Sequence, residues 1–182
     1  MVQLYIGEGK GKTTAAIGLA VRAAGAGLKV AIVFFDKGEP SDASEGPGYS
    51  ERPILRSIPN VDVFSSGLPR FRRGCEFRGG MTEEDVHEAK RGYDLAVRLL
   101  QEKAHALVVL DEILWLAQVG VLEEKQLIAL MELARTSPET ELVLTGRVDS
   151  PLLIQHADLV TEMRKIKHYF NSGVPARRGI EY

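Results

Sequence analysis

The sequence predicts an α/β fold in which helices cover both faces of a mostly parallel β-sheet. Short apolar runs alternate with segments whose apolar residues recur at helical spacing, and this alternation is typical of βαβ units. Residues 29–35 (KVAIVFF) form a continuous apolar run, as expected of a parallel strand covered on both sides. The chain has 182 residues, no internal repeat and no domain-sized change of composition, so we expect a single domain spanning residues 1–182.

Composition and charge narrow the class of protein. Hydrophobic residues make up 45% of the chain, and the net charge of −2 gives no indication of binding to nucleic acid or to a membrane surface. There is no apolar run of membrane length, and the sequence begins directly with a predicted strand and not with a signal peptide. The single cysteine, Cys75, excludes an internal disulfide and fits a reducing compartment. We therefore expect a soluble, cytoplasmic protein.

Each predicted element follows from a local pattern. Strands are expected at the apolar runs 2–6, 29–35, 61–65, 106–110, 142–144 and 159–163. Helical spacing predicts helices at 15–26, 83–103 and 123–135, with a short helix starting at Ser150 and Pro151. Thr82 is expected to cap the helix at 83–103, whose first turn is acidic. The stretches 39–50 and 66–80 are rich in glycine and polar residues, so we expect long loops there.

The strand at 2–6 runs directly into a glycine-rich loop and then into a helical pattern. The residues that carry this pattern are, in order, Gly7, Gly9, Gly11, Lys12, Thr13 and Thr14. A strand, a glycine loop and Gly-Lys-Thr at a helix start form the P-loop arrangement, in which backbone N–H groups and the helix N-terminus attract phosphate. Lys12 would reach the phosphates and the Thr13 hydroxyl would bind magnesium. The spacing is irregular, because Ile6 stands where the first glycine belongs and Gly7 comes one residue late.

Polar residues stand where each predicted strand ends. They are the P-loop, Asp36-Lys37, Ser65-Ser66, Asp111-Glu112 and Thr145–Arg147. Because ligands of parallel sheets bind beyond the carboxyl ends of the strands, we expect these residues to gather at one edge. Asp111 is the expected magnesium ligand, whereas Glu112 could order a water for hydrolysis, contact the metal or orient a neighbour. Arg147 could contact phosphate or pair with a carboxylate.

Several stretches together carry a family resemblance that covers nearly the whole chain in order. They are GEGKGKTTAA, FDKG, VVLDE, LTGR and the C-terminal ADLVTEMRKIKHYFNSGVPARRGIEY. These stretches are similar to those of the P-loop class of ATP:corrinoid adenosyltransferases, and the C-terminal stretch is the most specific of them.

The resemblance implies a RecA-like P-loop fold, a homodimer, and transfer of the 5′-deoxyadenosyl group from ATP to cobalt(I) of a corrinoid, with tripolyphosphate leaving. It implies that triphosphate and magnesium are held by Gly7, Gly9, Lys10, Gly11, Lys12, Thr13 and Thr14, with Asp111 and Glu112 completing the site. Lys37 of FDKG and Arg147 of LTGR are counted with the nucleotide-binding residues. A flavoprotein is a candidate partner for delivering the electron. No residue is expected to act as a general acid or base, because cobalt(I) is itself the nucleophile.

The sequence departs from the family pattern at the loop tip and in the corrinoid region. Glu8 stands where the family usually has Asn, and its carboxylate near the phosphates is either solvent-facing or metal-bound. Residues 67–74 (GLPRFRRG) replace the aromatic G-F-T-W segment of the corrinoid pocket, and Phe71 is the candidate substitute for the lost aromatic contact. The alternative is a solvated basic loop. Two other functions stay open at this point, a P-loop ATPase or kinase with an unrelated substrate and a nucleotide-binding regulatory module.

Overall fold

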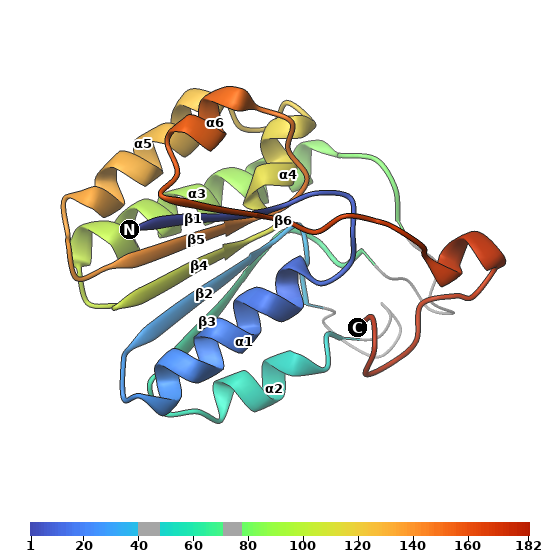
Figure 1. Cartoon of the computed structure of the whole chain (residues 1–182), viewed down its shortest axis with the longest axis horizontal. Coiled ribbons are helices and arrows are strands. Elements are labelled where there is room, and N and C mark those ends of the chain that lie inside the picture. Colours follow the sequence, from blue (N-terminus) through green and yellow to red (C-terminus); the bar gives the residue numbers. More distant parts are fainter. Residues whose placement is uncertain (40–47, 71–77) are drawn as a thin grey trace.

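The computed structural model describes residues 1–39, 48–70 and 78–182 and contains one six-stranded sheet. Its strands are β1 (Val2–Ile6), β2 (Val30–Phe35), β3 (Val61–Ser66), β4 (Leu107–Asp111), β5 (Glu141–Thr145) and β6 (Leu159–Glu162). They lie in the order β3-β2-β4-β5-β1-β6, and every neighbouring pair is parallel. The expected α/β class with a mostly parallel sheet is therefore confirmed (Figure 1).

The helices are α1 (Lys12–Gly25), α2 (Glu51–Arg56), α3 (Glu83–Glu102), α4 (Ile113–Gln118), α5 (Glu124–Arg135) and α6 (Pro151–Gln155), with a 3-10 helix, η1, at Tyr169–Ser172. Thr82 caps α3 as expected, since its hydroxyl accepts from the Asp85 N–H in a capping box. Sequence patterns missed α2, α4 and η1. These elements have 6, 6 and 4 residues, which is too short for helical periodicity to be recognised.

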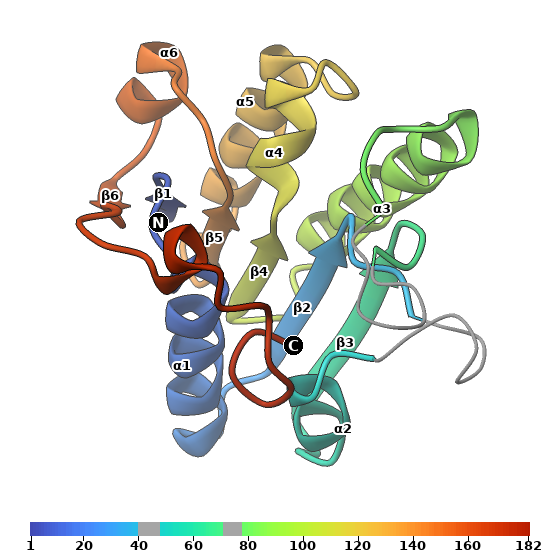
Figure 2. The same cartoon turned by 90° about the vertical axis from the view of Figure 1, so that its right-hand side faces the viewer.

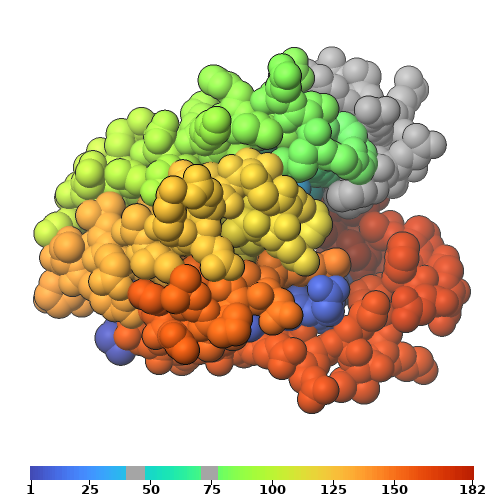
Figure 3. All heavy atoms as spheres, turned by 90° about the horizontal axis from the view of Figure 1, so that it is seen from above, coloured from blue at the N-terminus to red at the C-terminus, as the bar shows by residue number. Residues whose placement is uncertain are grey.

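Helices cover both faces of the sheet, as expected (Figure 2). Helices α1 and α2 pack on one face, over alternate strand residues such as Ile32 and Val109. Helices α3, α4 and α5 pack on the other face, over residues such as Val33 and Leu110, and α6 packs against α5. In Figure 3 these four helices cover that face, and the C-terminal segment (red) lies beyond their ends. Because side chains alternate along a strand, Asp111 faces the α1 side.

The carboxyl ends of the strands and the C-terminal segment lie on the same side of the molecule (Figure 1). The candidate residue Phe71, Cys75 and much of the two predicted long loops fall outside the described residues, at 40–47 and 71–77. None of the helices in the described residues combines the length and the hydrophobicity that a membrane span requires.

Candidate active site

The loop between β1 and α1 requires glycine at two positions because the chain that follows β6 packs closely against it. A Cβ at Gly7 would lie 2.6 Å from the Met163 carbonyl oxygen, and one at Gly9 would lie 2.5 Å from the same atom. The Gly9 N–H donates to that oxygen at 2.6 Å, and Gly7 has a φ of 104°. Both positions therefore require glycine for close main-chain packing. This contact gives the late glycine at position 7 a structural reason that the sequence alone did not show.

Lys12 lies inside the loop that it follows. Its ammonium donates to the carbonyl oxygens of Gly7 at 2.7 Å and Gly9 at 3.0 Å, and the side chain is largely buried. Burial lowers the pKa of Lys12, and the nearby carboxylates of Glu112 and Glu8 oppose that shift. The ammonium is thus held by two loop carbonyls. A phosphate oxygen bound in the loop could replace them as its hydrogen-bond acceptor.

A cluster of polar side chains joins the ends of β2, β4 and β5 to the start of α1. Asp111 is 1% exposed, and its Oδ1 accepts from the Thr145 hydroxyl at 2.7 Å. Its Oδ2 accepts from the Thr13 hydroxyl at 3.2 Å and from the Lys37 ammonium at 2.6 Å. Lys37 also donates to the Thr13 hydroxyl at 2.9 Å. Residues from three other parts of the chain therefore donate hydrogen bonds to one carboxylate.

Glu112 follows Asp111 with a left-handed backbone, at a φ of 62°, and its N–H donates to the Thr145 hydroxyl at 2.9 Å. Its Oε1 lies 4.0 Å from the Lys37 ammonium. Burial raises the pKa of Glu112, and the positive charge of Lys37 counteracts this shift. Burial alone would lower the pKa of Lys37, but Asp111 and Glu112 outweigh it and raise that pKa. Lys37 is therefore a cation at neutral pH.

The donor set suits magnesium that arrives with a nucleotide. Magnesium in proteins keeps several waters and binds through one or two carboxylates plus substrate phosphates. The hydroxyl of Thr13 and the carboxylate of Asp111 are already in contact, with Glu112 nearby. Among the described residues no group of three or more His, Cys, Asp or Glu could hold a metal by itself. A magnesium ion here would complete its coordination with phosphate oxygens and water.

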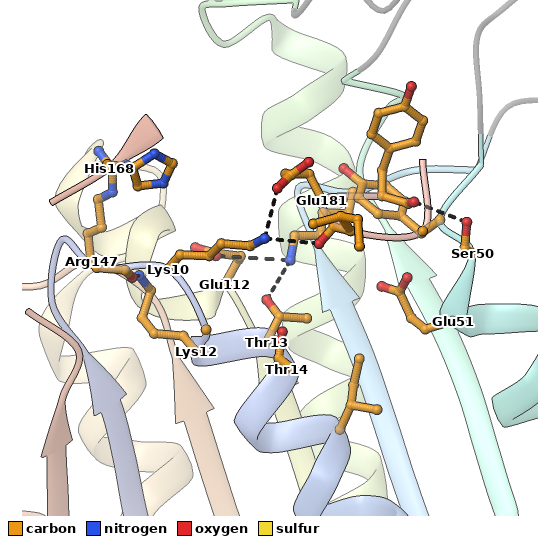
Figure 4. Close-up of a pocket in the computed structure, with 18 of the residues that line it drawn as sticks. Lys10, Lys12, Thr13, Thr14, Ser50, Glu51, Glu112, Arg147, His168 and Glu181 are labelled. Carbon is orange, nitrogen blue, oxygen red and sulfur yellow. Dashed lines mark hydrogen bonds and ion pairs between the residues drawn. The ribbon is translucent and has the colours of Figure 1, made fainter. Parts of the chain in front are cut away.

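A second network lies at the rim and ties the loop to the C-terminal segment. Lys10 donates to the Tyr169 hydroxyl at 2.9 Å, to the Ile180 carbonyl at 3.1 Å and to the Glu181 carboxylate at 2.8 Å. In Figure 4 Lys10 points toward Glu181, while Arg147 and His168 lie on the other side of the view from Ser50 and Glu51. Arg147 lies 3.3 Å from Glu8, with both side chains about half exposed, so its carboxylate alternative is the one seen here.

These groups surround a cavity of 710 Å³. The structure brings together at its wall most of the predicted nucleotide residues, namely Glu8, Gly9, Lys10, Gly11, Lys12, Thr13, Thr14, Lys37, Glu112 and Arg147. Gly7 and Asp111 lie behind this wall, in contact with Lys12 and Thr13. Sequence reasoning missed the other side of the cavity, which is built by Tyr49, Ser50, Glu51, Ile54, Glu181 and Tyr182. The family stretch at the C-terminus was the one available signal for the last two.

A second cavity of 430 Å³ adjoins the first, and the two share Lys37, Tyr49, Glu112 and Arg147 in their linings. Its apolar wall consists of Trp115 and Val119 from the α4 region together with Met81. Asp36 and Arg70 add a buried ion pair to its lining, in which the Arg70 Nε donates to the Asp36 carboxylate at 2.8 Å. The site thus has a polar compartment and a more apolar compartment with a common wall.

Comparison with known proteins gives a consistent result over the full chain. The model of the family described as ATP:corrinoid adenosyltransferase BtuR/CobO/CobP matches residues 1–182. A protein of Pseudomonas aeruginosa named corrinoid adenosyltransferase is 33% identical over 98% of this chain and 82% of its own length. The corrinoid adenosyltransferase of Escherichia coli K12 is 31% identical, and corrinoid adenosyltransferase CobA of Salmonella typhimurium is 32% identical, each over 100% of this chain and 85% of its own length. The chain therefore belongs to the ATP:corrinoid adenosyltransferase family.

Proposed function

We propose that this protein transfers the 5′-deoxyadenosyl group of ATP to the cobalt(I) of a corrinoid and releases tripolyphosphate. The observation that carries the proposal is the pair of adjoining cavities, one lined by the P-loop and the other with an apolar wall of Met81, Trp115 and Val119 beside charged side chains. Membership of the family and the names of the relatives support the same activity.

The proposed reaction needs an electrophile, a nucleophile and a stabilised leaving group. The electron pair of cobalt(I) forms a bond to C5′ of the ribose, and the bond between C5′ and its oxygen breaks with its electrons staying on the triphosphate. No proton moves in this step, so no residue is assigned as general acid or base. The protein has to hold the two substrates together, which contributes up to about 7–11 kcal/mol in favourable cases, and to stabilise the charge of the triphosphate.

For the triphosphate, we assign the residues that line or underlie the first cavity. They are Gly7, Glu8, Gly9, Lys10, Gly11, Lys12, Thr13, Thr14, Lys37 and Arg147. Thr13, Asp111 and Glu112 would hold magnesium, which when bound neutralises charge on the phosphate oxygens. Lys12 would exchange its two carbonyl acceptors for phosphate. Arg147 would leave Glu8, with which its contact is exposed, for the more negative triphosphate.

For the acceptor, we assign the second cavity, where Trp115 offers an aromatic side chain and Val119 and Met81 offer apolar surface. A corrinoid is a large ring with an apolar face and amide side chains, so an apolar wall beside polar groups suits it. The common wall would place this acceptor next to the nucleotide. The candidate role of Phe71 stays a prediction, as do the single domain, the homodimer, the flavoprotein reductant and the cytoplasmic location.

The direct test is anaerobic incubation of the protein with ATP, magnesium and a chemically reduced corrinoid, followed by the visible spectrum. We expect the cobalt(I) spectrum to convert to that of an alkylated corrinoid only when ATP and magnesium are both present. A Trp115→Ala variant should raise the corrinoid concentration needed for half-maximal rate and leave ATP affinity unchanged. Unchanged cobalt(I) spectra together with steady release of orthophosphate would instead support an ATPase or kinase.

A further inference from the structure

A positive charge of the protein itself stands among the groups assigned to magnesium. The Lys37 ammonium lies 2.6 Å from Asp111 Oδ2, 2.9 Å from Thr13 Oγ1 and 4.0 Å from Glu112 Oε1. These oxygens are the three protein groups proposed above for the metal. A second cation within a few ångströms of an ammonium is strongly repelled, because like charges interact by several kcal/mol at that separation in a site of low dielectric constant.

The fold fixes the main chain of Lys37 so that the side chain reaches this position. Asp36 has a left-handed backbone, with a φ of 55°, and its carboxylate is held by Arg70. The Lys37 carbonyl accepts from Arg52, which is 2% exposed. The Arg52 guanidinium carbon lies 4.8 Å from the Phe34 ring centre and 4.5 Å from that of Tyr49. A buried, stacked arginine is therefore used to anchor the residue that carries the ammonium.

The side chain of Lys37 also has a place to move. It lines both cavities, and 16% of it is exposed. The Tyr49 ring, whose centre is 5.9 Å from the ammonium, lines both cavities as well. Rotation about the side-chain bonds of Lys37 would carry the ammonium away from Asp111 along the wall that the two cavities share, where it can still face the triphosphate, without any change of the main chain.

We propose that Lys37 is a tethered cation that occupies the magnesium position in the nucleotide-free protein and yields it when magnesium arrives bound to ATP. In the free protein the ammonium compensates the buried charge of Asp111 and keeps Thr13 in contact with it. It also prevents free magnesium from binding there, so the metal enters with the triphosphate. Lys37 is in this sense a positioning residue whose side chain links metal binding to nucleotide binding. The inference rests on the proposed magnesium site and not on the identity of the acceptor.

The test measures metal binding to the full chain without ATP and without corrinoid. Manganese(II) replaces magnesium, and its free concentration is followed by electron paramagnetic resonance during a titration. Wild-type protein should bind Mn²⁺ weakly, whereas Lys37→Met should bind it at least about tenfold more tightly, because the competing charge is gone. Lys37→Arg keeps the charge and should bind as weakly as the wild type. Lys125→Met, which removes an exposed lysine far along the chain in α5, is the matched control and should also behave as the wild type.

Lys37→Gln is a second uncharged variant, for use if Lys37→Met fails to fold. Its amide can still donate a hydrogen bond to Asp111 but carries no charge. It too should bind Mn²⁺ more tightly than the wild type. Equal Mn²⁺ affinity in wild type, Lys37→Met and Lys37→Gln would overturn the proposal. So would wild-type protein that binds Mn²⁺ alone as tightly as it does with ATP. Because neither substrate is present, a failed adenosyl transfer would leave this result standing, and a failed metal result would leave the transfer standing.

Discussion

Two lysine–carboxylate pairs in this protein have nearly the same geometry and very different surroundings. Lys37 and Asp111 are 2.6 Å apart at the strand ends, with 16% and 1% of their side chains exposed. Lys10 and Glu181 are 2.8 Å apart at the rim, with 39% and 15% exposed. The first pair joins the ends of β2 and β4, and Thr13 of α1 contacts both partners. The second pair joins the P-loop to the last residues of the chain.

The two pairs differ in how strongly water and salt weaken the attraction between their charges. The strand-end pair is shielded, so its charges interact strongly and removing one partner leaves the other unpaired. The rim pair is open to solvent, where an ion pair contributes little and is screened by salt. We conclude that the strand ends form the rigid part of the candidate site. The C-terminal segment at residues 169–182, here called the cover, is held against the P-loop by weaker, exchangeable contacts.

The largest expected effect is on stability, from neutralising the buried carboxylate. Asp111→Asn would leave the Lys37 ammonium without its nearest counter-charge and should reduce the free energy of unfolding by about 3 kcal/mol. This loss is at the low end of the range for a broken buried ion pair, because the Glu112 carboxylate stays 4.0 Å from the ammonium. Glu181→Gln, the matched change at the rim, should shift the urea midpoint much less. Equal midpoint shifts in the two variants would contradict the distinction between the pairs.

A second effect separates the two lysines of the loop. Lys12→Ala removes a buried ammonium that donates to the loop carbonyls of Gly7 and Gly9 and that we propose exchanges them for phosphate. A bond to a charged group contributes about 1.5–3 kcal/mol, so ATP affinity should fall about 10- to 100-fold or more. Lys10→Ala, which removes the exposed ammonium of the rim, should cause a smaller loss. Calorimetric titration with MgATP measures both, and circular dichroism checks that both variants are folded. Wild-type affinity in folded Lys12→Ala protein would remove Lys12 from the site.

The smallest effect concerns the pH dependence of the cover. Hydrogen bonds from Arg177, Lys10 and Tyr169 hold the pKa of the Glu181 carboxyl well below its usual range. A carboxyl with a lowered pKa contributes its stabilisation above its unfolded pKa, about 4.3, and loses it as the pH falls toward the folded value. The N–H groups of Ile180 and Glu181, which donate to the Arg177 carbonyl, should therefore lose protection from hydrogen exchange below about pH 4.

The exchange rates need correction for their intrinsic dependence on pH, and the amides of β4 serve as the internal reference. Glu181→Gln should show the low protection of the C-terminal amides at every pH. Protection at residues 180 and 181 that stays constant down to pH 3 in the wild type would show that the carboxylate does not hold the cover.

Sequence patterns predicted the strand-end half of the site because it depends on local order. A buried strand followed by Asp111, and a strand followed by glycines and Lys12, need only the rule that parallel strands end at a common edge. Thr13 and Asp111, which lie far apart in the sequence, are in contact as that rule predicts. The same reasoning placed Lys37 at this edge, but it gave no indication that its ammonium would lie between Thr13 and Asp111.

The rim half could not be predicted in this way because it depends on long-range packing. Lys10 and Glu181 are separated by 171 positions, and no periodicity relates a C-terminal segment without long helices to a loop near the start. Tyr49 and Trp115 were missed because they stand beside or within helices of six residues, which leave no recognisable pattern. The need for glycine at positions 7 and 9 likewise arises from Met163, a contact that only the folded chain brings about.

The central claim is that the triphosphate is the leaving group, and the fate of labelled ATP tests it most directly. ATP carrying phosphorus-32 at the γ position is incubated with the protein, magnesium and a cobalt(I) corrinoid under anaerobic conditions, and the labelled products are separated. Because the bond that breaks lies between C5′ and its oxygen, labelled tripolyphosphate should appear in a one-to-one ratio with the adenosylated corrinoid. Stoichiometric release of labelled orthophosphate from ATP in the absence of corrinoid would contradict the account and identify an ATPase.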